Sequence, residues 1–229
     1  MISAFTRAIG QLPDPAFRSV LLKSFGLTLL VFIVLIGGLW TSIGGVDLND
    51  VAWIAWLPDF IISILNWMVG GIVVAAALIL FPAVASIFVS LFLDQIVDAV
   101  EAKHYPDETR GPGVPLGQSL LLSIKFSLVV ILVNILALPL YLIPGINLIV
   151  YYLVNGYLFG REYFELVALA HVSPQDADIL RVTNKGKVFI TGIVIAFLFS
   201  IPIVNFFTPI IAAAAMVHIF KGLRRPVGA

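Results

Sequence analysis

The chain has 229 residues, of which 61% are hydrophobic and 11% are charged, and its formal net charge at pH 7 is zero. An ordinary soluble domain has about 25% charged and about 45–50% apolar residues, so this composition indicates an integral membrane protein. The balanced charge offers no basic surface for nucleic acid, and the lack of cysteine excludes disulfides, thiol nucleophiles and thiolate metal sites.

Two long apolar segments in the N-terminal half are predicted to cross the bilayer, over residues 20–44 and 60–93. Each contains a charge-free run longer than the ~18 residues that a membrane helix needs. The second is longer than one crossing requires, so we expect its far end to project beyond the membrane. Asp94, Asp98 and Glu101 follow it at helical spacing, and we interpret this acidic stripe as a solvated helix face rather than a metal site.

The third and fourth apolar runs are each interrupted near the middle by the element I-P-x-[I/V]-N, at 143–147 and 201–205. Proline ends one helix, and asparagine favours the start of the next. At ~1.5 Å per residue, the apolar halves on either side are about 20–26 Å long, which is less than the hydrocarbon core of about 30 Å. We therefore predict two half-penetrating (re-entrant) helical hairpins, over 120–160 and 188–220.

The placement of Lys and Arg supports this topology. The connectors 94–119 and 161–187 both carry Lys and Arg, whereas the segment 41–59 carries aspartates and neither Lys nor Arg. Because short cytoplasmic loops are enriched in Lys and Arg, every inter-run segment except 41–59 is predicted to be cytoplasmic. The whole chain, 1–229, is predicted to be one all-α membrane domain with two long transmembrane helices, two re-entrant hairpins and short interfacial helices.

Two stretches between the hairpins are expected to form the short helices. Ser173, Pro174 and Asp176 have the pattern of an N-cap, a proline at the first helical position and an acid in the first turn. They predict a short helix that leads toward the second hairpin. The stretch 156–171 is interpreted as an interfacial helix with a charged side.

No pattern of catalytic or metal-binding residues is present. The three histidines, His104, His171 and His218, lack ligand spacing, and no H-E-x-x-H, G-x-S-x-G, P-loop or G-x-G-x-x-G occurs. His218 lies in an apolar run and is interpreted as structural, with its ring bonded to a backbone carbonyl or water. No carboxylate lies inside the four apolar runs, which argues against an obvious proton relay. Neither an enzyme nor a cofactor or metal site is predicted.

The re-entrant turns are suited to an anion. The second helix of each hairpin would point its free N–H groups and positive dipole end toward the middle of the membrane, with Asn147 and Asn205 as its N-caps. A possible anion path is therefore predicted at Pro144, Asn147, Pro202, Asn205 and Thr208. The alternative is that both hairpins serve only in packing.

A second anion-friendly feature precedes the first membrane helix. Pro15 opens a helix whose first turn contains Arg18 and Ser19, so backbone donors, a guanidinium and a hydroxyl come together. That set can hold a tetrahedral oxyanion. The alternative is that Arg18 is only a topology signal beside a membrane helix.

Several of these stretches are distinctive in combination. They are Pro15 with Arg18, the end of the second run at 92–101, LIPGIN at 142–147 and SIPIVNFFTPIIAAAAMVHI at 200–219. On these residues the chain resembles the CysZ-type sulfate permease family of bacterial inner membranes. The resemblance implies two long membrane helices with two half-penetrating hairpins, sulfate uptake for cysteine biosynthesis, and homo-oligomeric assembly.

The resemblance also implies a sulfate-binding site. Family members bind sulfate at a G-[L/I]-R-R turn before the first membrane helix, and the matching residues here are Ala16, Phe17, Arg18 and Ser19. The first arginine is kept, whereas the glycine and the second arginine are replaced, so the turn has one charge fewer.

The resulting hypothesis is a multi-pass inner-membrane sulfate permease. Its expected partners are sulfate or a related oxyanion, the lipid bilayer and further copies of the chain, with no nucleic acid. The alternative is a non-transporting membrane scaffold or partner-binding protein of the same fold.

Overall fold

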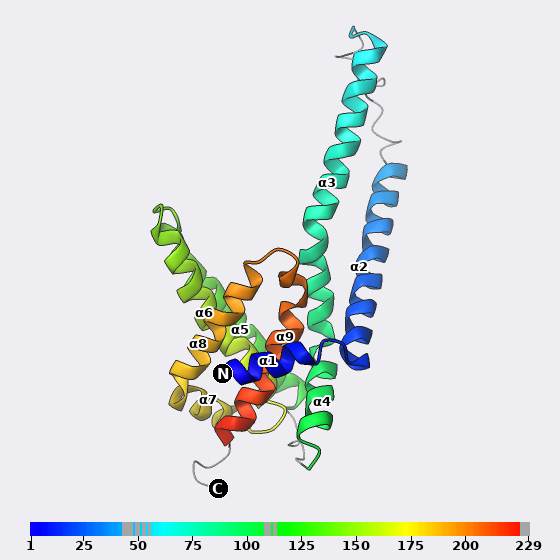
Figure 1. Ribbon diagram of the computed structural model, residues 1–229. Helices are drawn as coiled ribbons and strands as arrows, with labels where there is room; N and C mark the ends of the chain where they lie inside the picture. Colours follow the sequence, from blue (N-terminus) through cyan, green and yellow to red (C-terminus); the bar gives the residue numbers. More distant parts are fainter. Residues whose placement is uncertain are drawn as a thin grey trace. The chain divides into compact units, whose positions relative to one another are not determined.

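The computed structural model describes residues 1–42, 48, 51, 54, 56–107, 111 and 114–224. All regular secondary structure within these ranges is helical (Figure 1). The chain forms two compact units, residues 19–91 and residues 1–18 with 92–229, and each is described by itself. The prediction of a single membrane domain stays a prediction.

Long apolar helices confirm the prediction of an all-α membrane protein. Among the described residues, three stretches are long and apolar enough to cross a bilayer: Pro15–Gly38, Leu121–Tyr141 and Val204–Arg224. A fourth results if α7 (Pro174–Thr183) and α8 (Lys185–Phe199), which meet at a bend of 87°, are taken together.

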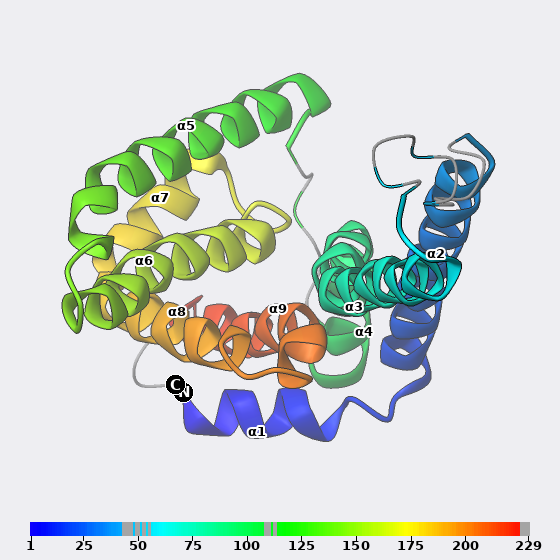
Figure 2. The same ribbon diagram turned by 90° about the horizontal axis from the view of Figure 1, so that it is seen from above.

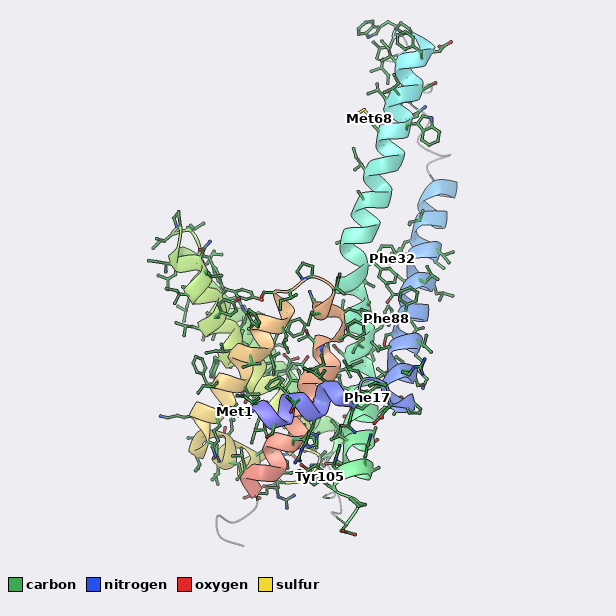
Figure 3. All side chains as sticks on the ribbon, in the orientation of Figure 1. Met1, Phe17, Phe32, Met68, Phe88 and Tyr105 are labelled. Carbon is green, nitrogen blue, oxygen red and sulfur yellow. The ribbon has the colours of Figure 1, made fainter. Side chains whose placement is uncertain are left out.

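The smaller unit consists of most of α2 (Pro15–Ser42) and all of α3 (Asp59–Leu91). With 28 and 33 residues, at ~1.5 Å per residue, they are about 42 and 50 Å long, which exceeds the hydrocarbon core of about 30 Å. The ring of Phe81 on α3 lies 5.0 Å from that of Phe25 and 5.7 Å from that of Phe32 (Phe32 is labelled in Figure 3), both on α2. Aromatic contacts therefore join the two helices.

The larger unit is a bundle with α9 (Val204–Arg224) at its centre. Around α9 pack α1 (Ile2–Gly10), α4 (Leu93–His104), α6 (Ile146–Ala168) and α8. Most of α9 is buried, and its alanine run Ala212–Ala215 is fully covered, because small side chains let neighbouring helices approach closely. By contrast, α5 (Leu116–Tyr141) lies at the periphery (Figure 2), and only 6% of its apolar stretch is buried, as expected of a helix that faces lipid.

Both predicted hairpins are present, and the I-P-x-[I/V]-N element forms the turn of each. The first joins α5 to α6 and the second joins α8 to α9. In each turn the residue after the proline has a positive φ, 84° at Gly145 and 70° at Ile203. The next helix begins one residue later. The two elements therefore form the same kind of turn, one with glycine and one with a β-branched residue in the left-handed region.

The arms of the first hairpin are longer than their apolar halves. α5 has 26 residues and α6 has 23, or about 39 and 35 Å at ~1.5 Å per residue, because they continue past Lys125 and Arg161 into the charged connectors. The stretch 156–171 is therefore not a separate interfacial helix, since α6 runs without a break to Ala168. The arms are therefore long enough to cross a bilayer, and the half-penetrating depth stays a prediction that rests on the positions of the charges.

The short helix predicted after residue 173 is confirmed. The backbone N–H of Asp176 donates to Oγ of Ser173 at 3.2 Å, and Pro174 is the first helical residue. The sharp bend at Asn184 then separates this helix, α7, from α8. Such a bend is expected where an interfacial helix leads into a membrane hairpin.

The two hairpins pack against each other through glycine. A Cβ atom added at Gly192 of α8 would lie 1.8 Å from the carbonyl oxygen of Gly156 and 2.6 Å from the backbone nitrogen of Gly160, both on α6. The backbones of α6 and α8 are therefore in direct contact. Gly156 and Gly160 form a G-x-x-x-G motif, which is typical of close helix pairs in membranes, although this contact was not predicted.

Candidate functional site

The residues of the predicted sulfate turn occupy the start of α2, which begins at Pro15. Arg18 is exposed and Ser19 is partly exposed, whereas Phe17 is fully buried. Ala16 and Phe17 can therefore contribute only their backbone N–H groups, as expected of residues in a first helical turn. The N–H of Arg18 already donates to the carbonyl oxygen of Asp14 at 3.0 Å.

A carboxylate beside this turn alters its electrostatics. Asp14 directly precedes Pro15, and its two carboxylate oxygens accept from Nζ of Lys103 at 2.8 and 3.1 Å. Asp14 brings a negative charge to the helix N-terminus, where an oxyanion would otherwise be favoured. Lys103, the cation that the fold adds here, is engaged by that carboxylate. Arg18 is left as the exposed positive charge of the turn.

The asparagines at the hairpin turns are not N-caps, so that prediction was wrong. Asn147 and Asn205 are each the second residue of their helix, and Gly145 holds the N-cap position of α6 without a side-chain bond. Their own N–H groups donate back to Ile143 at 3.1 Å and to Ile201 at 2.9 Å. The physical reason is the left-handed residue after each proline, which reverses the chain early and starts the helix sooner.

The other predicted path residues divide between surface and core. Pro144 and Pro202 are exposed, whereas Thr208 is buried and its hydroxyl donates to the carbonyl oxygen of Val204 at 2.9 Å. The two turns lie apart from each other in both views of the larger unit (Figures 1 and 2). The predicted path residues therefore do not converge at one point within this chain.

A buried charged cluster, not predicted from the sequence, lies where α4, α9 and the segment after α6 meet. It consists of Glu101, His171 and Lys221, whose side chains are 10%, 0% and 1% exposed. Nζ of Lys221 is 3.1 Å from Oε1 of Glu101 and 3.0 Å from Nε2 of His171. Nε2 of His171 is itself 2.6 Å from the same carboxylate oxygen.

The interpretation of the acidic stripe was therefore wrong for one of its members. Asp94 and Asp98 are exposed as expected, but Glu101 lies on the buried face of α4 with Val97 and Val100. The partners of Glu101 come from two other elements far along the chain. Helical spacing alone cannot distinguish such a residue from one on a solvated face.

The ring of His171 contacts a backbone carbonyl and both other members of the cluster. Nδ1 is 2.9 Å from the carbonyl oxygen of Val167, which can only accept, so Nδ1 carries a proton. Nε2 of His171 therefore faces both Oε1 of Glu101 and Nζ of Lys221 within hydrogen-bond distance.

A cavity of about 430 Å³ lies between α1, α8 and α9. Its polar lining includes Arg7, Tyr105, Lys187 and His218, and no Asp or Glu is among the described residues that line it. The hydroxyl of Tyr105 (labelled in Figure 3) lies 2.9 Å from Nδ1 of His218. The partner of His218 is thus a phenol rather than the predicted carbonyl or water.

Tyr105 connects the cavity to the charged cluster. Nζ of Lys221 lies 5.6 Å from the centroid of the Tyr105 ring, within the range of a cation–π contact. His104 lies nearby, with its ring centroid 4.9 Å from that of His218. Burial, followed by the charges of Lys103 and Arg7, lowers the pKa of His104 below its ordinary value. The surroundings of the cavity are therefore predominantly positive.

Comparison with known proteins gives one family match. A family model described as Sulfate transporter CysZ/Etoposide-induced protein 2.4 matches residues 4–209. The match includes the predicted sulfate turn, the Gly-x-x-x-Gly contact and both hairpin turns, and it ends inside α9. No curated protein matches the chain. In the part of the chain that the structure describes, no group of three His, Asp or Glu residues is placed to hold a metal ion.

Proposed function

The chain belongs to the sulfate transporter CysZ/etoposide-induced protein 2.4 family, and on this premise we propose that it is a permease for sulfate or a related tetrahedral oxyanion. The family match over 4–209, which covers the first hairpin and the turn of the second, is the observation that carries this proposal. We further propose that the protein resides in a bacterial inner membrane and supplies sulfate for cysteine biosynthesis.

Charge provides the physical support for an anion as substrate. Arg18 is exposed at the start of a helix whose first N–H groups point toward the preceding turn. Fixed positive charges of this kind lower the energy of an anion in a poorly hydrated environment.

The hairpin turns support assembly of more than one copy. The turn residues Pro144 and Pro202 are exposed in the single chain, and Ile203 is 83% exposed. Irregular backbone at membrane depth is tolerated only where protein or a wet cavity covers it. We propose that further copies of the chain cover these turns and that the anion path runs between them.

The proposal is tested by sulfate flux into liposomes that contain the purified protein. We expect uptake of labelled sulfate above that of protein-free liposomes. Arg18→Ala should raise the sulfate concentration for half-maximal flux roughly tenfold or more, because a charge-assisted hydrogen bond contributes about 1.5–3 kcal/mol. Lys185→Ala, which removes another exposed cation, should leave this concentration unchanged.

A membrane scaffold is the second candidate, and the Asp14–Lys103 ion pair beside the sulfate turn favours it. A carboxylate at a helix N-terminus competes with an external oxyanion for the same N–H groups. Flux equal to that of protein-free liposomes, from protein with native helix content, would reject the permease and support the scaffold. Unchanged flux in Arg18→Ala would instead remove Arg18 from the site and retain the permease.

A further inference from the structure

We infer that the cavity between α1, α8 and α9 binds a tetrahedral oxyanion, either a free sulfate or phosphate ion or the phosphate of a lipid head group. This site is separate from the predicted turn at Ala16–Ser19, and it requires no transport activity. The inference goes beyond the proposed function because it would hold for a scaffold as well as for a permease.

The charges that line the cavity are of one sign. Arg7 of α1 and Lys187 of α8 both line it, and its described lining contains no carboxylate. Among the described residues of the larger unit, no salt bridge involves either of these two cations. Lys103 pairs with Asp14, Lys221 pairs with Glu101, and Arg161 pairs with Glu165. An anion in the cavity would supply the countercharge that Lys103, Lys221 and Arg161 obtain from carboxylates.

A buried hydrogen-bonding atom gives independent support. His218 is 7% exposed and lines the cavity, and its Nε2 has no hydrogen-bond partner among the described residues. Its Nδ1 lies 2.9 Å from the hydroxyl of Tyr105. When that hydroxyl donates to Nδ1, the proton of a neutral imidazole is on Nε2. Nε2 is then a buried donor beside a cavity, and an oxyanion oxygen would satisfy it.

The size of the cavity defines the class of ligand. A volume of about 430 Å³ is within the range of about 300–1,000 Å³ for small-molecule sites. It accommodates a tetrahedral anion together with its waters, or with the glycerol of a phospholipid. Lys187 belongs to the connector predicted to be cytoplasmic, so both an ion from solution and a lipid of the inner leaflet can reach the site. A free ion and a lipid head group would both present the oxygens of a tetrahedral oxyanion to the site.

The test measures anion binding in an Arg18→Ala background, so that the predicted turn does not contribute. Protein in a non-ionic detergent is titrated with labelled sulfate and with inorganic phosphate. The double change Arg7→Gln with Lys187→Gln should weaken binding at least tenfold. Lys185→Gln is the matched control, because Lys185 is an exposed lysine of the same helix that does not line the cavity, and it should change binding less than twofold.

A lipid measurement distinguishes the two sources. Native mass spectrometry would record how much phosphatidylglycerol and phosphatidylcholine the protein retains, and whether phosphatidylglycerol displaces labelled sulfate. Displacement, with retention reduced in the double variant, identifies the lipid phosphate as a ligand. If inorganic phosphate displaces labelled sulfate and phosphatidylglycerol does not, the free ion is identified as the ligand. Either result supports the site.

The inference is overturned if neither anion binding nor retention of phosphatidylglycerol depends on Arg7 and Lys187. Because both side chains are exposed, the double variant is expected to fold, and its helix content measured by circular dichroism would check this. Binding at the cavity without liposome flux would retain the site and reject the permease. Sulfate flux without anion binding at the cavity would retain the permease and reject the cavity site.

Discussion

The contact between the two hairpins gives the sharpest structural prediction, which concerns Gly192→Ala. The added Cβ would lie 1.8 Å from the carbonyl oxygen of Gly156, whereas Cβ atoms essentially never approach another heavy atom within 3.0 Å. The nearby atoms belong to the backbone of Gly156 and Gly160, and a backbone atom cannot rotate away. The α6 and α8 helices must therefore separate.

The magnitude follows from what that separation disrupts. Overpacking of a well-packed contact costs about 1–3 kcal/mol. Separation would also loosen the stacked rings of Phe159 and Phe199, whose centroids are 4.7 Å apart, and the 3.4 Å hydrogen bond from the hydroxyl of Tyr151 to the carbonyl of Ala196. We expect the upper end, about 3 kcal/mol, which corresponds to roughly 6–12 °C in melting temperature for a chain of this size.

A thermal melt followed by far-UV circular dichroism in detergent measures this effect. Tryptophan fluorescence would be a poor probe, because all four tryptophans lie between residues 40 and 67 and thus outside the unit that contains α6 and α8. Gly186→Ala is the matched control on the same helix, since nothing lies within 4 Å of its added Cβ. It should be neutral or slightly stabilising. If Gly192→Ala and Gly186→Ala melt alike, the direct backbone contact between the hairpins is refuted.

Three further predictions concern the turns, the buried cluster and the pH response. Ile203→Gly should stabilise by about 1 kcal/mol, because it removes a β-branched residue from left-handed backbone, and Gly145→Ile should destabilise by a similar amount; thermal shifts of the same sign would contradict the shared turn. Glu101→Gln should cost about 3–5 kcal/mol, because the Lys221 cation is left buried without its carboxylate. Adding Lys221→Met should restore part of that loss in denaturant titrations, and no restoration would reject the pair. The pKa of His104 lies below its ordinary value of 6.5. As the pH falls, His104 therefore binds a proton in the unfolded chain before it does in the folded chain, and the stability of the fold should decrease below about pH 6.5. His104→Gln should reduce the difference between midpoints measured at pH 7.5 and 5.5, and an unchanged difference would exclude His104 as its source.

The features that the sequence predicted correctly depend on interactions between residues that are close together in the sequence. Apolar runs long enough for a bilayer predict membrane helices, and the I-P-x-[I/V]-N element within such a run predicts a turn. The Ser173 cap is correct for the same reason, because its hydrogen bond joins residues three positions apart. The turns at 143–147 and 201–205 were placed correctly, but the caps were not. The left-handed residue after each proline starts the helix earlier than the position of the asparagine suggested.

The tertiary structure alone decided where the buried charges lie. Glu101, His171 and Lys221 come from separate parts of the chain, and only the packing of α4 and the end of α6 around α9 brings them together. The packing of α1 and α8 against α9 places Arg7 and Lys187 at one cavity. A charged residue on an amphipathic helix has the same sequence spacing whether it faces water or a buried partner. Burying it is favourable only when a distant opposite charge satisfies it, and local sequence does not encode that pairing.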